Sequence, residues 1–155
     1  MRVGSAEGWP PLADKTFPAV WRCNRRKFIF VGCIKMFRMG VIEESLENSD
    51  VLDTLKPFFH SQKLEEVLGD EFPNCHTNEY HVPDEKINDL VSILEQQVKL
   101  TWYIHAFNDE KLIVIFRGKS FHISLHRDDT WNAMIEYGDT VKVERRYSES
   151  IPLSV

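Results

Sequence analysis

Residues 100–126, LTWYIHAFNDEKLIVIFRGKSFHISLH, decide the fold of this chain. Three runs in this stretch are rich in β-branched and aromatic residues, and two short polar segments separate them. Residues of the first kind favour extended strands, and short polar segments between such runs favour tight turns. The stretch therefore predicts a three-stranded antiparallel meander over residues 99–126.

The second turn of the meander is marked by Gly118, which lies between two apolar runs. Glycine adopts a positive φ without a Cβ clash, as the first central position of a type II′ hairpin turn requires. A turn centred on Gly118 and Lys119 pairs Phe116 with Phe121. Because side chains alternate across a strand, six apolar residues then share one core face. They are Leu112, Val114, Phe116, Phe121, Ile123 and Leu125.

The opposite face of this hairpin mixes apolar and polar side chains, because polar residues alternate with the core residues along its last strand. Exposed faces of this mixed kind are typical of protein interfaces. We therefore expect an interaction surface here, carried by Ile113, Ile115, Arg117, His122 and His126.

The first turn, at residues 108–111, leaves the register of the first strand open. A loop with an even number of residues places Tyr103, His105 and Phe107 on the core face. A loop with an odd number places the more apolar set there, namely Leu100, Trp102, Ile104 and Ala106. A change of one residue moves every side chain of the strand to the other face. We favour the odd loop, which brings His105 to the face of His122.

The segments before the meander supply a further strand and short helices. Apolar residues within 37–46 predict a first strand, and helical spacing over 51–59 predicts a helix that Pro57 ends. We expect a helical turn over 62–68 and a short edge strand over 79–82.

Two longer helices follow from 3.6-residue spacing. One begins near Pro83, which suits the first turn of a helix, and its apolar stripe should pack on the core face of the meander. The other follows His126 and turns Trp131, Met134 and Ile135 inward. The predicted fold is α+β: a small antiparallel sheet, the meander plus one or two strands, with two or three helices packed on one face.

Charge is distributed unevenly along the chain, whose formal net charge is −5. Residues 1–39 hold eight Lys/Arg and two Asp/Glu, whereas residues 40–155 hold 11 basic and 22 acidic residues. Nucleic acids and anionic membranes both select positively charged surfaces. We therefore expect the acidic part of the chain to bind neither.

Residues 1–36 form a basic segment with three prolines and three glycines and without strand or helix periodicity before Lys27. We expect one α+β domain over 37–155 and an irregular extension over 1–36, either disordered or not part of the native protein. Translation from Met36 or Met39 would account for the second alternative. A basic arm that contacts nucleic acid or an acidic partner is the other interpretation.

Cysteine use and apolar run length bear on location. Cys23, Cys33 and Cys75 have neither the spacing of a zinc finger nor an even count for a disulfide framework, so we expect free thiols and a cytoplasmic protein. The longest apolar run, residues 28–34, is far shorter than the roughly 20 residues that span a bilayer.

Six histidines raise the question of a metal site. His122 and His126 share a strand face but lie about 13 Å apart along it, too far for one ion. His105 and His122 are the closer pair, although zinc needs further ligands, for which Glu79 and His81 are candidates. Surface histidines without a metal are the simpler interpretation, and we expect no cofactor.

No motif in the chain specifies a reaction. The leading hypothesis is a non-catalytic protein-interaction or regulatory domain that binds a partner protein, or a second copy, through the histidine-bearing face or a sheet edge. The alternative is a small metal-dependent or histidine-based hydrolase with His105 and His122 at its site. The third is contact of the basic arm with nucleic acid.

Overall fold

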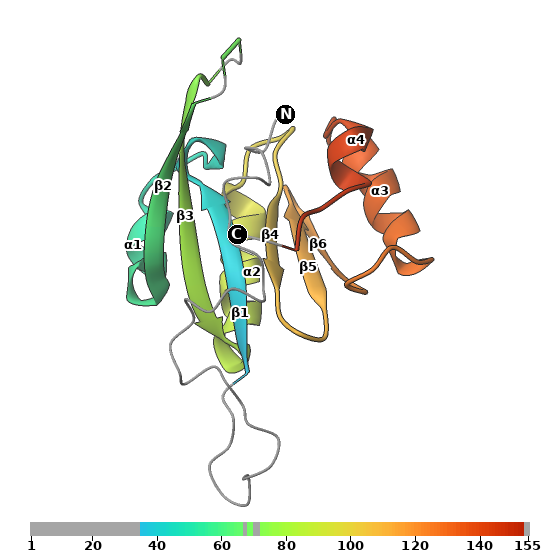
Figure 1. Cartoon of the computed structure of the whole chain (residues 1–155), viewed down its shortest axis with the longest axis horizontal. Helices are drawn as coiled ribbons and strands as arrows, with labels where there is room; N and C mark the ends of the chain where they lie inside the picture. The colour runs from blue at the N-terminus through green and yellow to red at the C-terminus, as the bar shows by residue number, and fades with distance from the viewer. Residues whose placement is uncertain (1–34, 67, 70–71, 154–155) are drawn as a thin grey trace, which may run out of the picture.

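The computed structural model describes residues 35–66, 68–69 and 72–153 (Figure 1). The extension expected over residues 1–36 therefore lies outside the described residues, except for Lys35 and Met36. Met36 already belongs to the first strand of the sheet.

Within the described residues, six strands form one antiparallel sheet in the order β2-β3-β1-β4-β5-β6. The strands are β1 (Met36–Ile42), β2 (Phe59–Glu66), β3 (Asn74–Pro83), β4 (Ile104–Phe107), β5 (Leu112–Phe116) and β6 (Lys119–Ile123). The helices are α1 (Val51–Leu55), α2 (Asp84–Gln97), α3 (Thr130–Thr140) and α4 (Arg145–Ser148), with short 3₁₀ segments η3 (Glu43–Ser45) and η4 (Lys56–Phe58). The α+β class and the antiparallel meander are confirmed. No helix in the described ranges has both the length and the apolar character to cross a bilayer.

The helices lie on both faces of the sheet, so that two apolar cores share it (Figure 1). Ile113 and Ile115 of β5 belong to one core together with the apolar side chains of α2. Val114 and Phe116 belong to the other core together with those of α3. The sequence predicts instead that the helices lie on one face of the sheet, with the helix that follows Pro83 packed against Val114. Because β5 is buried on both faces, it needs apolar side chains packed on each of them. In the structure α2 covers the face of Ile113 and Ile115, opposite to Val114.

Three strands, instead of one or two, accompany the meander. Residues 59–66 form β2, where the sequence predicts a helical turn over 62–68. The segment contains good helix formers, but pairing with β3 outweighs that local preference. The strand expected at 79–82 is part of β3, and because β2 lies outside it, β3 is not an edge strand.

The first hairpin of the meander has the even loop. His105 lies opposite Val114 and Phe107 lies opposite Leu112, so the odd loop favoured on apolarity is wrong. Asn108 closes the turn, since its Oδ1 accepts hydrogen bonds from the backbone N–H groups that follow at residues 110 and 111. Both faces of the strand are buried, so apolarity could not discriminate between the two registers.

The second hairpin pairs Phe116 with Lys119, so Arg117 and Gly118 are its central residues. Gly118 has a φ of +83°, as the third residue of a type II turn requires. The predicted pairing is displaced by two residues. Because the displacement is even, Phe121 still lies on the predicted core face.

The turn at Gly118 provides a test of backbone strain and packing. The Tyr137 hydroxyl donates to the Arg117 carbonyl oxygen over 2.7 Å and would lie 3.3 Å from a Cβ at position 118. We expect Gly118→Ala to lower the free energy of unfolding by about 1–2 kcal/mol, measured by urea unfolding. Gly69 is the matched control, because its φ is +85° and no atom of the described residues lies within 4 Å of its Cβ position. Equal losses in the two variants would show that the Tyr137 contact contributes nothing.

Candidate functional site

The structure separates the histidines predicted to pair. His105 is buried on the α3 side of the sheet, where its ring stacks on Phe107 with centroids 5.9 Å apart. His122 lies opposite Ile113, on the α2 side, and is exposed. His126 follows β6 in an exposed turn. Because the sheet lies between His105 and His122, these two side chains cannot hold one ion or serve one reaction.

The centre of the sheet face expected to bind a partner is buried beneath α2. Ile113 and Ile115 have 0% exposure and belong to the core beneath α2. Arg117 is partly buried and donates to the Val98 carbonyl oxygen over 3.2 Å. The exposed histidines of this set, His122 on β6 and His126 in the bend after it, lie at the rim of the face, so it cannot serve as the broad mixed surface that the sequence suggests.

A buried polar network instead occupies the half of the α3-side face formed by β1, β3 and β2. Arg38 of β1 lies opposite His81 of β3. The Arg38 Nε donates to Glu79 Oε1 over 2.8 Å, and both side chains are 3% exposed. His81 Nε2 also lies 2.8 Å from Glu79 Oε1, and the Ser61 hydroxyl of β2 donates to Oε2 over 3.4 Å. Three strands therefore contribute to one carboxylate.

The network keeps Glu79 ionised. Burial by itself raises the pKa of this carboxyl, but hydrogen bonds from His81 and Arg38 outweigh that effect and lower the pKa from 4.5 to about 2. The buried carboxylate is thus matched by the always charged Arg38 guanidinium. Neither charge can be removed without leaving the other in the interior.

His60 joins this network from a β-bulge in β2. The register with β3 shifts between Phe59 and Ser61, which sets His60 outside the regular alternation of the strand. Its exposed ring stacks on His81, with centroids 4.0 Å apart and planes inclined by 17°. Burial, followed by repulsion from His81, lowers the pKa of His60. Within the described ranges, His60, Glu79 and His81 are the one group of three ligand-type side chains whose donor atoms converge.

The outer edge of β2 is the second candidate surface. In the part of the chain that the structure describes, β3 is the one strand that pairs with β2. Phe59 and Leu64 of β2, and Leu68 in the turn that follows, are exposed by 50%, 59% and 91%. Figure 1 shows β2 at one end of the sheet, with the β2–β3 hairpin reaching beyond the neighbouring strands.

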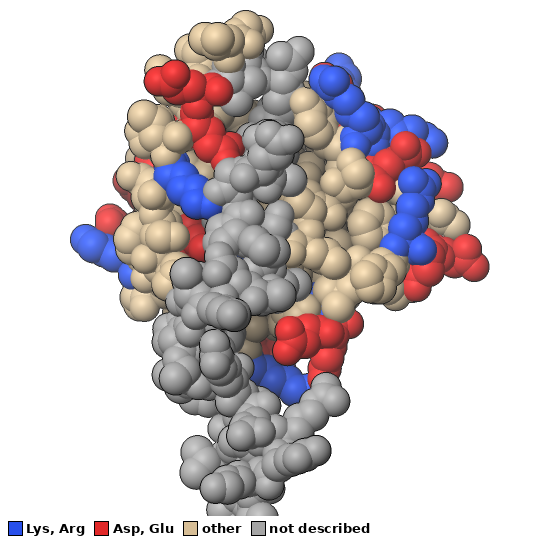
Figure 2. All heavy atoms as spheres, in the orientation of Figure 1, with Lys and Arg blue, Asp and Glu red and all other residues tan. Residues whose placement is uncertain are grey.

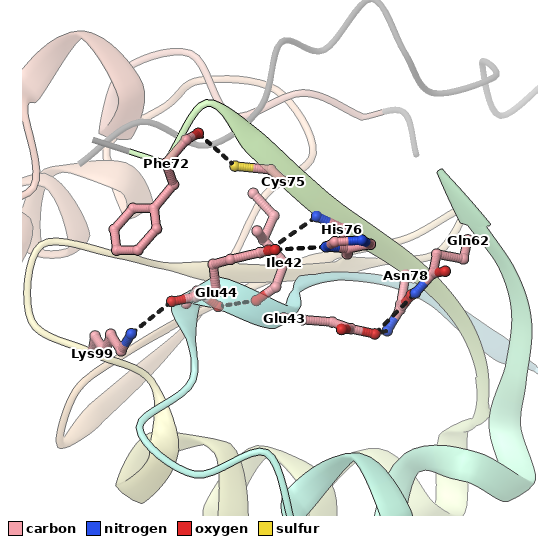
Figure 3. A network of polar contacts seen from close by, with 10 residues as sticks. Ile42, Glu43, Glu44, Gln62, Phe72, Cys75, His76, Asn78 and Lys99 are labelled. Atoms are coloured by element: carbon pink, nitrogen blue, oxygen red, sulfur yellow. Dashed lines mark hydrogen bonds and ion pairs between the residues drawn. The ribbon is translucent and has the colours of Figure 1, made fainter. Parts of the chain in front are cut away.

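A second polar network, at the η3 end of β1, holds this hairpin in place (Figure 3). Glu43 Oε1 accepts hydrogen bonds from Asn78 of β3 and Gln62 of β2, each 2.9 Å long. Glu44 accepts one from the His76 backbone N–H over 2.9 Å and contacts His76 Nδ1 at 2.7 Å. Both strands of the hairpin are therefore tied to the segment that follows β1.

The sequence identified part of the buried network. It singled out Glu79 and His81, which share a strand face two residues apart, but missed Arg38 and His60. His60 was missed because β2 was not predicted. A strand predicted over residues 59–66 would have suggested a hairpin with β3 that places His60 beside His81.

No protein-family model, curated protein or solved structure matches this chain. Its function has to be inferred from the buried network and from the β2 edge.

The Arg38–Glu79 pair yields a stability prediction. Glu79→Gln removes the negative charge and leaves the buried Arg38 uncompensated, so we expect the free energy of unfolding to fall by about 3–5 kcal/mol in urea titrations. Glu110→Gln is the control, because Glu110 also forms an ion pair, with Lys35 at 2.6 Å, but its side chain is 60% exposed. Exposed pairs contribute little. Losses of similar size in both variants would contradict the prediction.

The His76–Glu44 contact yields a pH prediction. The hydrogen bond to Glu44 raises the pKa of His76 above its ordinary value of 6.5. A raised pKa in the folded state stabilises the fold below the unfolded-state pKa, and this contribution is lost as the pH rises through the folded-state value. We expect His76→Gln to destabilise the protein more at about pH 5 than at about pH 8.5 in urea unfolding. An effect independent of pH would contradict this.

Proposed function

We propose that this protein is a non-catalytic interaction domain that pairs strands through the outer edge of β2, and that the strand it binds is β2 of a second copy. The observation that carries the proposal is the unpaired outer edge of β2 among the described residues, with Leu64 59% exposed near the middle of the strand. An edge strand offers a row of backbone donors and acceptors to an incoming strand. The strand contains no proline, which would interrupt such pairing.

The sequence of β2 is complementary to itself in one antiparallel register. Residues that face each other across two strands must lie on the same side of the sheet, so the two-fold axis of such a dimer passes through a residue. An axis at Leu64 sets Leu64 against its own copy. It also sets Lys63 of each copy against Glu65 of the other, which gives two oppositely charged pairs. Opposite charges directly across two strands contribute roughly 0.2–1 kcal/mol per pair.

The neighbouring registers are unfavourable. An axis at Lys63 opposes two lysines, and an axis at Glu65 opposes two glutamates and sets Leu64 against Glu66 of the second copy. Like charges directly opposite each other are destabilising. The charge pattern therefore favours the register centred on Leu64.

The environment of Glu65 supports the same register. Both carboxylate oxygens are buried, and neither has a hydrogen-bond donor among the described residues. Burial raises the pKa of this carboxyl, and Lys63 of the same strand counteracts the effect. In this register Lys63 of the second copy lies opposite Glu65 and adds a second positive charge beside it.

The contact expected from one short strand is small. Stable specific interfaces bury about 1,200–2,000 Å² in total, and the edges of two eight-residue strands cover less. The proposed dimer is therefore weak and depends on concentration. A cytoplasmic location belongs to the same proposal and is supported by three cysteines without the pattern of a disulfide framework.

The other two hypotheses have less support. The hydrolase hypothesis needs His105 and His122 together, and the sheet separates them. The nucleic-acid hypothesis rests on the basic arm, which lies outside the described residues. On the face shown in Figure 2, charges of both signs are interspersed among the described residues, without the basic footprint that a phosphate backbone selects.

Charge exchange at Lys63 and Glu65 tests the dimer. We expect the parent protein to dimerise with rising concentration in sedimentation velocity experiments. Lys63→Glu and Glu65→Lys should each weaken the dimer, because each creates two like-charge pairs across the axis. The double variant should dimerise again. An equimolar mixture of the two single variants should form heterodimers, since every new charge then faces its opposite.

Leu64→Lys provides the apolar counterpart of this test. It places two lysines on the axis and should weaken the dimer, whereas Leu100→Lys should not, because Leu100 is equally exposed, at 59%, but lies away from β2. A protein that stays monomeric at every concentration, or single variants that are not rescued in the mixture, would overturn the proposal.

A further inference from the structure

The bulge of β2 brings a metal-type set of side chains together on the α3-side face. One potential ligand atom each of His60, Glu79 and His81 lies within 4.8 Å of the other two. The observation is independent of the β2 edge, because it depends on the sheet face and on the β2–β3 pairing. We propose that these three residues bind one divalent transition-metal ion of the zinc type.

The distances within the set fit a shared ion after small movements. Zinc binds imidazole nitrogen and carboxylate oxygen at about 2.0–2.2 Å, which puts two ligand atoms of a tetrahedral site roughly 3.4 Å apart. His81 Nε2 and Glu79 Oε1 are 2.8 Å apart and joined by a hydrogen bond. The imidazole nitrogen and the carboxylate are thus already close to ligand separation, and a small rotation of the carboxylate lets an ion on Oε2 replace this hydrogen bond.

Glu79 can bind an ion while it keeps its contact with Arg38. Its Oε1 accepts from Arg38 over 2.8 Å, whereas the contact that the described residues offer to Oε2 is the longer one of 3.4 Å from Ser61. Oε2 is therefore the oxygen that the geometry assigns to the ion. Hydrogen bonds to the other oxygen of a ligating carboxylate orient it, and Arg38 has this positioning role. The guanidinium charge lowers the affinity, so the ion is exchangeable.

Binding requires one rearrangement, at His60. The lone pair of an imidazole nitrogen lies in the plane of its ring, and the rings of His60 and His81 are stacked 4.0 Å apart with planes only 17° from parallel. Two rings in this arrangement cannot direct lone pairs at one ion. His60 is exposed, and exposed side chains change rotamer within nanoseconds. Turning its ring out of the stack therefore completes the ligand set at small cost.

The composition of the set indicates the class of ion. Two imidazoles and one carboxylate suit zinc, cobalt or nickel, whereas calcium and magnesium favour sites built from oxygen ligands. Three protein ligands leave a coordination position for water, unlike the closed four-ligand sites that stabilise small domains. The ion would also link His60 of β2 to two residues of β3, beside the segment proposed to pair.

Titration of the untagged full chain with cobalt(II) tests this inference, with visible absorption and the imidazole nitrogen resonances as readouts. We expect saturable one-to-one binding that shifts the His60 and His81 resonances and that zinc competes away. His60→Ala should weaken binding at least about tenfold, as loss of even an outer-shell partner of a metal site weakens binding about 10–100-fold. Because His60 is exposed, the variant should keep the parent's circular dichroism and melting temperature.

The matched control is His122→Ala, since His122 is also exposed but lies on the other face of the sheet. It should bind cobalt(II) as the parent does. The inference is overturned if the parent does not bind cobalt(II), if His60→Ala binds it unchanged, or if both variants lose binding equally.

Discussion

The burial of β5 on both of its faces is the constraint on which the rest of the structure depends. All five of its residues, Leu112–Phe116, have 0% exposure. A strand of this kind needs an apolar layer on each side, and α2 and α3 supply one each. The sheet therefore has no exposed apolar face over the meander. The half formed by β1, β3 and β2 is where polar groups take the place of a second apolar layer.

In that half the Arg38–Glu79 ion pair occupies the buried positions on the sheet face that apolar side chains occupy elsewhere. Two buried charges cost more to desolvate than a matched apolar pair, so such a network adds less to stability than apolar packing of the same volume. His81 and Ser61 complete the hydrogen bonding of the carboxylate, and His60 adds an exposed imidazole beside it. The same strand, β2, carries both His60 and the unpaired edge, so the two proposed binding regions adjoin.

The errors in the site prediction have two origins, the register of the first hairpin and the unpredicted strand β2. The loop at residues 108–111 determines which face His105 occupies, and a change of one residue in its effective length moves the whole strand. With the register shown by the structure, His105 packs against Phe107 and His122 lies on the other side. Because residues 62–68 have a helix-forming composition, the sequence did not predict β2. It therefore also missed His60, which lies beside Glu79 and His81.

Local patterns by themselves determined the meander, the helix that follows Pro83, the α+β class and the core face of the last strand. Each of these follows from periodicity or turn chemistry within a few residues. Tertiary structure alone decided which face each helix covers, the register of the first hairpin and the pairing of Arg38 with Glu79, which are 41 residues apart. One physical reason is that apolar residues occupy both faces of β5, so periodicity could not assign a helix to either face. The other is that two side chains that meet across strands produce no recognisable pattern in the sequence around either residue.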